Sequence, residues 1–278
     1  MHIRLGFSTC PNDTFMFDAM VHGRIDTRSH TFEVHLADIS QLNAWALAGA
    51  LDMVKISYHT YGLIRDSYHL LDAGSALGYG CGPLLVARQP LTPAQLASGD
   101  LRVAIPGRNT TANLLLDFFV PSLQNKVEMI FHDIMPAVQR GDVDAGLIIH
   151  ESRFTYPDYG LVMVQDLGTY WEQQTGLPIP LGAIVASKSL PQPVVEELDA
   201  IMHDSVVFAF AHPEESLPFV QAHAQELKPA VMQEHIKLYV NDFSLSLGTL
   251  GHAAVDTLLR TGEQMGAYSA SSKPAPKS

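Results

Sequence analysis

Short apolar runs alternate with amphipathic stretches along most of this chain, and this order of elements limits its fold more than any other feature. In the first part of the chain the expected elements are a strand over residues 3–7, a helix over 14–21, a strand over 32–36, a helix over 39–50 and a strand over 53–56. A turn at Pro11, Asn12 and Asp13 precedes the first helix, and Gly23 follows it.

The same alternation continues through the middle of the chain. The expected elements there are strands over residues 101–105, 127–131, 145–149 and 161–164, and helices over 110–120 and 134–140. From residue 192 to about residue 259 the chain is mostly helical, with breaks near Pro213, Pro229 and Gly248. Strands that alternate with helices predict an α/β fold with a largely parallel sheet.

Two distant segments repeat one pattern, an apolar strand followed by a cation and then by a proline at a helix start. If they are paired crossovers, near residues 85–92 and 178–186, the chain leaves one lobe, builds a second and returns. The expected lobes are residues 1–90 with 181–278, and residues 91–180. A chance likeness between two ordinary strand–loop–helix connections is the alternative.

Charge and cysteine content narrow the class of protein. The formal net charge is -12, and no cluster of Lys and Arg is present, which argues against DNA, RNA and anionic membranes as partners. No apolar run is long enough to span a bilayer, and the first residues lack the pattern of a secretory signal. Two cysteines do not make a disulfide framework. We therefore expect a cytoplasmic protein with no nucleic-acid or membrane partner.

Ligands of open α/β sheets bind beyond the carboxyl ends of the strands, so polar residues at those ends are the first site candidates. After the first strand come Cys10, Pro11, Asn12 and Asp13. Pro11 and Asn12 favour a tight turn, and Asn12 or Asp13 is a better candidate for a helix cap than for a ligand contact. Nothing adjacent in the sequence activates the Cys10 thiol, so we expect no catalytic role for it.

The strand over residues 53–56 carries Lys55 near its end and is followed by Ser57. A lysine in an apolar strand is costly unless it meets an anion or reaches water. Two interpretations follow. Either Lys55 and the hydroxyl or amide of Ser57 contact an anionic substrate, or Lys55 extends to solvent beside a helix cap.

A third strand end, residues 106–112, leads directly into an apolar helix. Gly107 allows a sharp turn, after which the backbone amides of Thr111 and Ala112 face the ligand side. A helix N-terminus carries partial positive charge and suits a carboxylate or a phosphate. Because the glycine–lysine–serine pattern of a P-loop is absent, the segment predicts either a different anion cradle or an ordinary helix cap.

His150 follows the fourth apolar strand, residues 145–149, and is the leading candidate for a general base. An imidazole changes protonation near neutral pH, and the end of a strand places it where ligands bind. The chain has 13 histidines, so position rather than residue type distinguishes His150. The sequence lacks metal-binding His and Cys spacings, a Ser–His–Asp nucleophile motif and a dinucleotide-binding glycine motif. We expect neither a metal nor a cofactor.

At these same strand ends the sequence resembles the 1,4-dihydroxy-6-naphthoate synthases of the futalosine route to menaquinone. The likeness runs in order from about residue 3 to about residue 265 and leaves out the C-terminal tail. Each matching segment is weakly specific alone, but the combination is specific. The segments are STCPNDTF (8–15), KISYH (55–59), PGRNTTA (106–112), IMPAV (134–138), DAGLIIHE (144–151) and GLPIPLG (176–182).

The resemblance implies a two-lobe fold like that of the type II periplasmic-binding proteins, with an interdomain cleft and two hinge crossovers. It implies a lyase that converts cyclic de-hypoxanthine futalosine to 1,4-dihydroxy-6-naphthoate and closes over a small anionic substrate bearing a carboxylate. Carried over to this sequence, the resemblance makes His150 the proton acceptor. It makes Lys55, Ile56 and Ser57 one substrate-binding segment, with Thr111 and Ala112 as the other.

Two other functions fit the same fold. A solute-binding protein captures small molecules outside the cytoplasm, and the missing secretory signal argues against it. A chorismate-dehydrating relative from the same pathway is expected to differ in the Cys-Pro-Asn-Asp and Ile-His-Glu segments.

Overall fold

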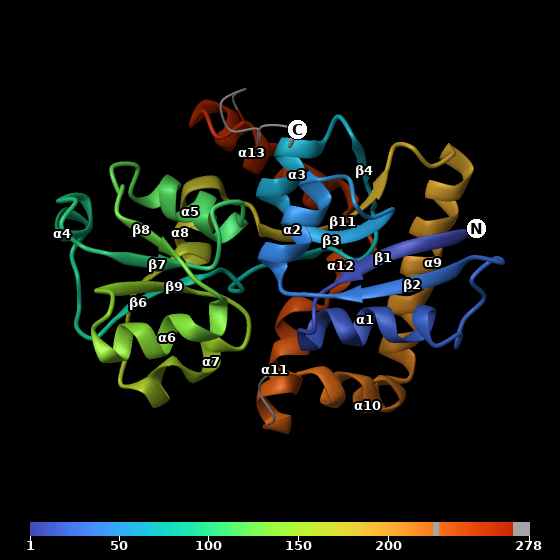
Figure 1. Cartoon of the computed structure of the whole chain (residues 1–278), viewed down its shortest axis with the longest axis horizontal. Helices are drawn as coiled ribbons and strands as arrows, with labels where there is room; N and C mark the ends of the chain where they lie inside the picture. The colour runs from blue at the N-terminus through green and yellow to red at the C-terminus, as the bar shows by residue number, and fades with distance from the viewer. Residues whose placement is uncertain (225–227, 269–278) are drawn as a thin grey trace. The chain divides into compact units, whose positions relative to one another are not determined.

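The computed structural model describes residues 1–224 and 228–268, and the chain forms two compact units (Figure 1). The first unit comprises Met1–Gly78 and Pro180–Ser278, and the second comprises Tyr79–Ile179. The tail over 269–278, expected in lobe one, lies outside the described residues. Among the described residues, no helix is long and apolar enough to cross a membrane.

The first unit contains a six-stranded mixed sheet with the order β2-β1-β3-β11-β4, in which β5 also pairs with β11. Its strands are β1 (His2–Phe7), β2 (Thr31–Leu36), β3 (Met53–Ser57), β4 (Tyr68–Leu70), β5 (Ala76–Gly78) and β11 (Ile179–Ser187). Strand β1 is parallel to β2 and β3, whereas β11 is antiparallel to β3 and β4. The largely parallel sheet expected from the sequence is therefore corrected to a mixed one. Helical crossovers connect β1, β2 and β3, so these strands run parallel. The chain returns to the sheet through β11 from the second unit, without a helical crossover in this unit, and β11 runs antiparallel to β3.

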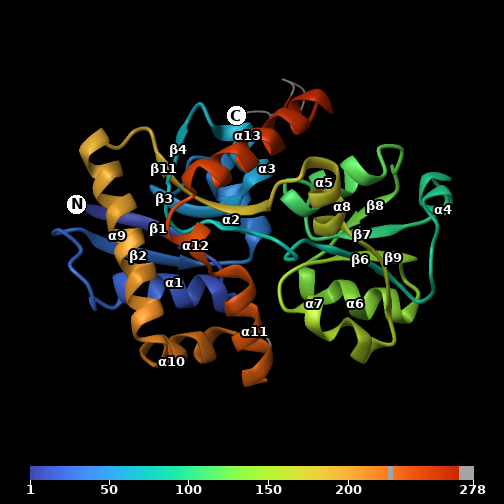
Figure 2. The same ribbon diagram turned by 180° about the vertical axis from the view of Figure 1, so that it is seen from behind.

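Helices cover both faces of this sheet (Figures 1 and 2). They are α1 (Pro11–Val21), α2 (Ile39–Leu47), α3 (Tyr58–Ile64), α9 (Gln192–Ala211), α10 (Pro213–His223), α11 (Pro229–Tyr239), α12 (Asp242–Leu245) and α13 (Gly248–Gln264). Ring stacking of Phe7 on Phe17, at a centroid distance of 4.3 Å, joins β1 to α1, and Met202 of α9 is buried in the same core. The expected breaks near Pro213, Pro229 and Gly248 are confirmed, because each residue begins a helix.

The second unit contains a five-stranded sheet with the order β10-β6-β9-β7-β8. Its elements are β6 (Leu84–Ala87), α4 (Pro93–Ala97), β7 (Val103–Ile105), α5 (Thr111–Phe119), β8 (Lys126–Glu128), α6 (Phe131–Arg140), β9 (Ala145–Ile148), α7 (Ser152–Thr155), a 3₁₀ turn (Tyr156–Tyr159), β10 (Val162–Asp166) and α8 (Leu167–Thr175). Helices α5 and α8 lie on one face of this sheet, and α6 and α7 lie on the other (Figures 1 and 2). Helix α6 packs so closely that a Cβ on Gly146 of β9 would lie 2.5 Å from Ile134.

The two sheets are separate, as the paired-crossover hypothesis requires. Leu5 and Val54 lie in the sheet of the first unit, and Val103 and Leu147 lie in that of the second. One strand differs from expectation: β6, placed in lobe one from the sequence, pairs with β9 and β10 of the second unit. The chain therefore enters the second unit at Tyr79, before β6, because this fully buried strand completes the second sheet.

Candidate functional site

Lys55 lies in the middle of β3 with only 3% of its surface exposed. Its ammonium lies 3.3 Å from the Asp13 carboxylate oxygen Oδ1 and donates a hydrogen bond to the Gly74 carbonyl at 3.2 Å. The Lys55 side chain therefore does not extend to solvent. Of the two sequence interpretations, the one in which Lys55 reaches solvent is wrong. Its ion pair lies within the protein.

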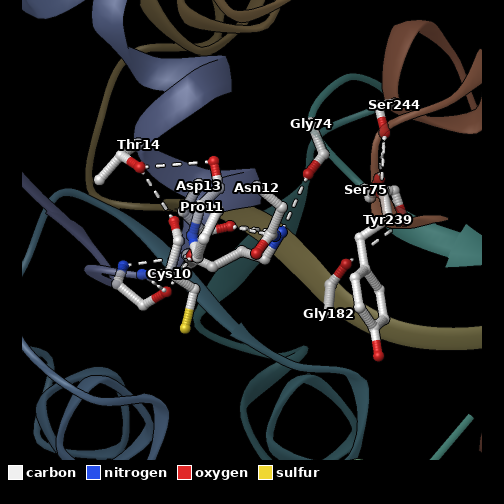
Figure 3. A network of polar contacts seen from close by, with 12 residues as sticks. Cys10, Pro11, Asn12, Asp13, Thr14, Gly74, Ser75, Gly182, Tyr239 and Ser244 are labelled. Carbon is white, nitrogen blue, oxygen red and sulfur yellow. Dashed lines mark hydrogen bonds and ion pairs between the residues drawn. The ribbon is translucent and has the colours of Figure 1, made fainter. Parts of the chain in front are cut away.

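Asp13 and Asn12 occupy the first turn of α1 (Figure 3), and neither caps it. The N-cap residue is Cys10, and it makes no side-chain cap bond, because Pro11 starts the helix earlier than expected. The cap interpretation was wrong. The Asp13 carboxylate instead accepts from the Ser8 hydroxyl at 2.6 Å and from the Asn12 amide at 2.8 Å.

Ser57 is held by Asn43 of α2 through two hydrogen bonds. The Asn43 side-chain Nδ2 donates to the Ser57 hydroxyl oxygen at 3.0 Å, and the Ser57 backbone N–H donates to the Asn43 side-chain Oδ1 at 2.9 Å. Ile56 is fully buried, so its side chain belongs to the core rather than to a ligand surface. Sequence reasoning missed Asn43, because it lies inside an amphipathic helix and carries no local motif.

Thr111 and Ala112 are the first two residues of α5, and both are buried. Thr110 caps this helix: its hydroxyl accepts from the Asn113 N–H at 3.2 Å and donates to the Gly107 carbonyl at 2.7 Å. Gly107 has φ of 141°, a conformation that favours glycine. A cap and an anion cradle are compatible here, because the cap occupies the third amide of the helix and the cradle uses the first two.

A second set of contacts holds the loop that leads into α5. The Asn113 side chain donates to the Arg108 carbonyl at 3.0 Å and accepts from the Lys126 ammonium at 2.9 Å. Lys126 also pairs with Asp117, one turn further along the helix. These contacts join β8 to the start of α5 and to the loop before it.

His150 lies two residues beyond the end of β9, in the turn before α7. Its φ is 57°, the left-handed region, which costs energy for a residue with a side chain and often marks a functional position. Its half-buried ring packs edge-on against Phe131 of α6, with ring centroids 5.0 Å apart. Phe131 was expected to end a strand; it begins a helix instead, and this places it beside His150.

The turn that carries His150 is fixed by Arg153. One guanidinium nitrogen donates to the Gly82 carbonyl and another to the Asp166 carboxylate, both at 2.6 Å. The other Asp166 oxygen caps α8 by accepting from the Gly168 and Thr169 amides. Arg153 thus joins the His150 turn to the strand entry before β6 and to the start of α8.

Parallel pairing explains why these segments group within each unit. Strands β7 and β9 are parallel neighbours, so the Thr111 and His150 segments that follow them lie at the same edge of the second sheet. Strands β1 and β3 are parallel neighbours in the first sheet, so the Asp13 and Ser57 segments share an edge there. Lys55, Ile56 and Ser57 belong to the first unit, and Thr111, Ala112 and His150 belong to the second.

No group of three or more His, Cys, Asp or Glu residues able to hold a metal ion occurs within residues 1–224 and 228–268. Both cysteines are buried. Burial raises the pKa of the Cys81 thiol to about 12, so this thiol is a poor nucleophile.

Comparison with known proteins identifies the family. A family model described as "Menaquinone biosynthesis" matches residues 3–264. The chain belongs to this family. A protein of Thermus thermophilus named 1,4-dihydroxy-6-naphthoate synthase is 50% identical over 272 residues, 98% of each chain. A Streptomyces coelicolor protein of the same name is 47% identical over 265 residues, 92% of this chain and 91% of its own.

Solved structures place this menaquinone biosynthesis family member among periplasmic-binding-protein folds. A protein of Archaeoglobus fulgidus is 37% identical with a TM-score of 0.89 and covers 95% of this chain and 98% of its own. The alkanesulfonate-binding protein of Xanthomonas axonopodis has a TM-score of 0.71 at 14% identity, covering 99% and 94%. The periplasmic aliphatic sulphonate-binding protein of Escherichia coli has a TM-score of 0.64 at 12% identity, covering 95% and 87%. The expected two-lobe, periplasmic-binding-protein-like fold is confirmed.

Proposed function

We propose that this chain is a 1,4-dihydroxy-6-naphthoate synthase, a lyase of menaquinone biosynthesis that acts on cyclic de-hypoxanthine futalosine. The observation that carries the proposal is its similarity to two proteins of that name, over 98% of the chain in the more similar case. The resemblance of the strand-end segments supports the same activity, because those segments contain every residue proposed to bind or react.

His150 is the proposed general base that starts the elimination. An imidazole can take up a proton near neutral pH without help from a metal. The turn of His150 is constrained by Arg153 and by the Phe131 ring, which favours a single orientation of the imidazole. A base held in one orientation loses less entropy when it reaches the transition state.

Two segments are proposed to bind the substrate, which carries a carboxylate. The backbone amides of Thr111 and Ala112 lie at the positive end of α5, where an anion is favoured. At Ser57, the Asn43 amide already occupies one acceptor position of the hydroxyl, so the hydroxyl proton is directed elsewhere and suits a substrate oxygen. Both segments therefore supply donors, which matches an anionic ligand.

The test is product formation from cyclic de-hypoxanthine futalosine by the purified chain, followed by mass spectrometry. Appearance of 1,4-dihydroxy-6-naphthoate supports the proposal. Chorismate is supplied in a parallel reaction, and its dehydration would assign the chain to the chorismate-dehydrating relatives instead. Tight binding of the substrate without turnover would favour a solute-binding role.

The proposal includes a cytoplasmic location and a small-molecule partner, in keeping with the biosynthetic relatives. Cell fractionation of the native organism with an antibody against the chain tests the location. Recovery in the periplasmic fraction would contradict it.

A further inference from the structure

Asp13 and Lys55 form an ion pair that is almost closed to solvent, with side chains 3% and 4% exposed. Asp13 belongs to the first turn of α1, and Lys55 belongs to β3. The Gly74 carbonyl (Figure 3) accepts a hydrogen bond from the same Lys55 ammonium at 3.2 Å. A buried ammonium is strongly destabilising without its partner. These two contacts therefore fix the middle of β3 against α1 and the Gly74 loop.

The surroundings of Asp13 select a carboxylate and reject an amide. Oδ2 accepts from the backbone N–H and the hydroxyl of Ser8, at 3.2 and 2.6 Å. Oδ1 accepts from the Asn12 amide and pairs with Lys55. All four neighbours are donors, so an asparagine at position 13 would turn its own NH₂ group toward at least one of them.

One further hydrogen bond and one glycine support this arrangement. The Asn12 side-chain oxygen is hydrogen-bonded to His235 Nε2 of α11 at 2.9 Å, and His235 is fully buried. In β11, residue 182 is a glycine, which leaves room for the Lys55 side chain. A Cβ on Gly182 would lie 2.8 Å from Lys55 Cε.

We propose that Asp13 is a positioning residue that holds Lys55, and with it the backbone and hydroxyl of the segment up to Ser57, in the geometry that binds substrate. The inference rests on the proposed function, in which Lys55, Ile56 and Ser57 form a substrate-binding segment. The charge of Lys55 is then balanced by Asp13 and not by the substrate. The donors that meet the ligand are those of the ordered backbone and of the Ser57 hydroxyl.

The variant Asp13→Asn separates this role from direct charge contact. If Asp13 positions the segment, KM rises about tenfold or more, and so does the substrate Kd titrated by calorimetry in a His150→Ala background that slows turnover, while kcat at saturation falls less. If Lys55 contacts the substrate directly, the ammonium released from its carboxylate keeps or lowers the Kd. Lys55→Met also raises the Kd, and the double variant Asp13→Asn with Lys55→Met is no weaker than the worse single variant. Additive losses would overturn the inference.

A second variant and a matched control keep the outcome interpretable. Gly182→Ala displaces the end of the Lys55 side chain while leaving every charge in place, so it should fold and still raise the Kd. Asp133→Asn makes the same chemical change at the same position of α6, where the side chain is exposed, and should bind normally. Normal Kd values in folded Asp13→Asn and Gly182→Ala would overturn the positioning role of Asp13 and would leave the proposed function intact. Absence of product from the unmodified chain counts against the proposed function instead, because the calorimetric comparison does not require turnover.

Discussion

His150 combines an unfavourable backbone conformation with the proposed role of proton acceptor. Its ring contacts Phe131 and is half-buried, so removal of the imidazole takes little from the core. We expect His150→Ala to fold normally and to bind substrate with little change in KM. The kcat should fall by about two to four orders of magnitude, the usual contribution of a positioned acid–base group. Steady-state kinetics on the purified variant measure this.

The pH dependence of the reaction gives an independent check of the same residue. A base acts in its neutral form, so kcat/KM of the unmodified chain should rise with pH across the range in which an imidazole loses its proton. The residual activity of His150→Ala should lack this rise. His132→Ala, which alters an exposed histidine of the same unit, should keep the rate and the profile. A nearly normal rate in folded His150→Ala would contradict the role of His150 as general base, and His59 would be the next candidate.

Ala112 tests the amide cradle at a single residue. Proline is tolerated in the first turn of a helix, so Ala112→Pro should fold, yet it removes one backbone donor and adds bulk where we propose that the ligand carboxylate binds. A hydrogen bond to a charged group contributes about 1.5–3 kcal/mol, so the Kd should rise by roughly tenfold or more. Titration calorimetry measures the Kd.

A matched variant separates loss of the donor from a general effect of proline. Ala94 occupies the same helical position in α4, where it is exposed. Ala94→Pro also places a proline at the second helical position and should bind substrate normally. Equal binding by the Ala112→Pro and unmodified chains would show that the cradle is misassigned.

At the scale of elements, Arg153 holds three segments of the second unit together. Its pair with Asp166 is largely buried, with side chains 17% and 12% exposed. Breaking such a pair by removing one partner leaves a buried charge, so Arg153→Ala should lower the free energy of unfolding by about 3–5 kcal/mol. Arg65→Ala breaks an exposed pair with Glu263 and should cost less than about 1 kcal/mol. Urea unfolding measures both losses, and equal values would contradict this role of Arg153.

Most elements could be predicted from the sequence because their signals are local. The helix ended by Gly141 and the prolines that open α10 and α11 were found in this way. Helix α8 was missed, although Asp166 caps it and Gly176 ends it in the left-handed conformation. Both of these signals are readable in the sequence, and the weak amphipathic pattern between them concealed the helix.

At the scale of the whole molecule, the net charge predicts which partners are excluded. With 17 basic and 29 acidic residues, the chain should repel a phosphate backbone at a distance. We expect no binding of a labelled DNA duplex or of single-stranded RNA in fluorescence anisotropy, even at low salt. Binding that weakens with added salt would contradict this prediction.

Local conformations, and the residue types at the strand ends, could be read from the sequence. Periodicity set the α/β class, and the Gly107-to-Ala112 segment predicted a turn followed by a helix start, because these properties depend on neighbours within a few residues. Position at the end of an apolar strand also singled out His150. These inferences needed no knowledge of which strands pair.

Which distant groups meet depends on long-range packing and could not be read from the sequence. The pairs Asp13 with Lys55, Asn43 with Ser57 and Arg153 with Asp166 join different elements, and β6 could have completed either sheet. A buried polar group lowers the free energy only when its partner arrives from elsewhere in the chain, and no local pattern records that partner. The sequence therefore located the candidate segments, whereas long-range packing determined that Asp13 is the partner of Lys55 and not a helix cap.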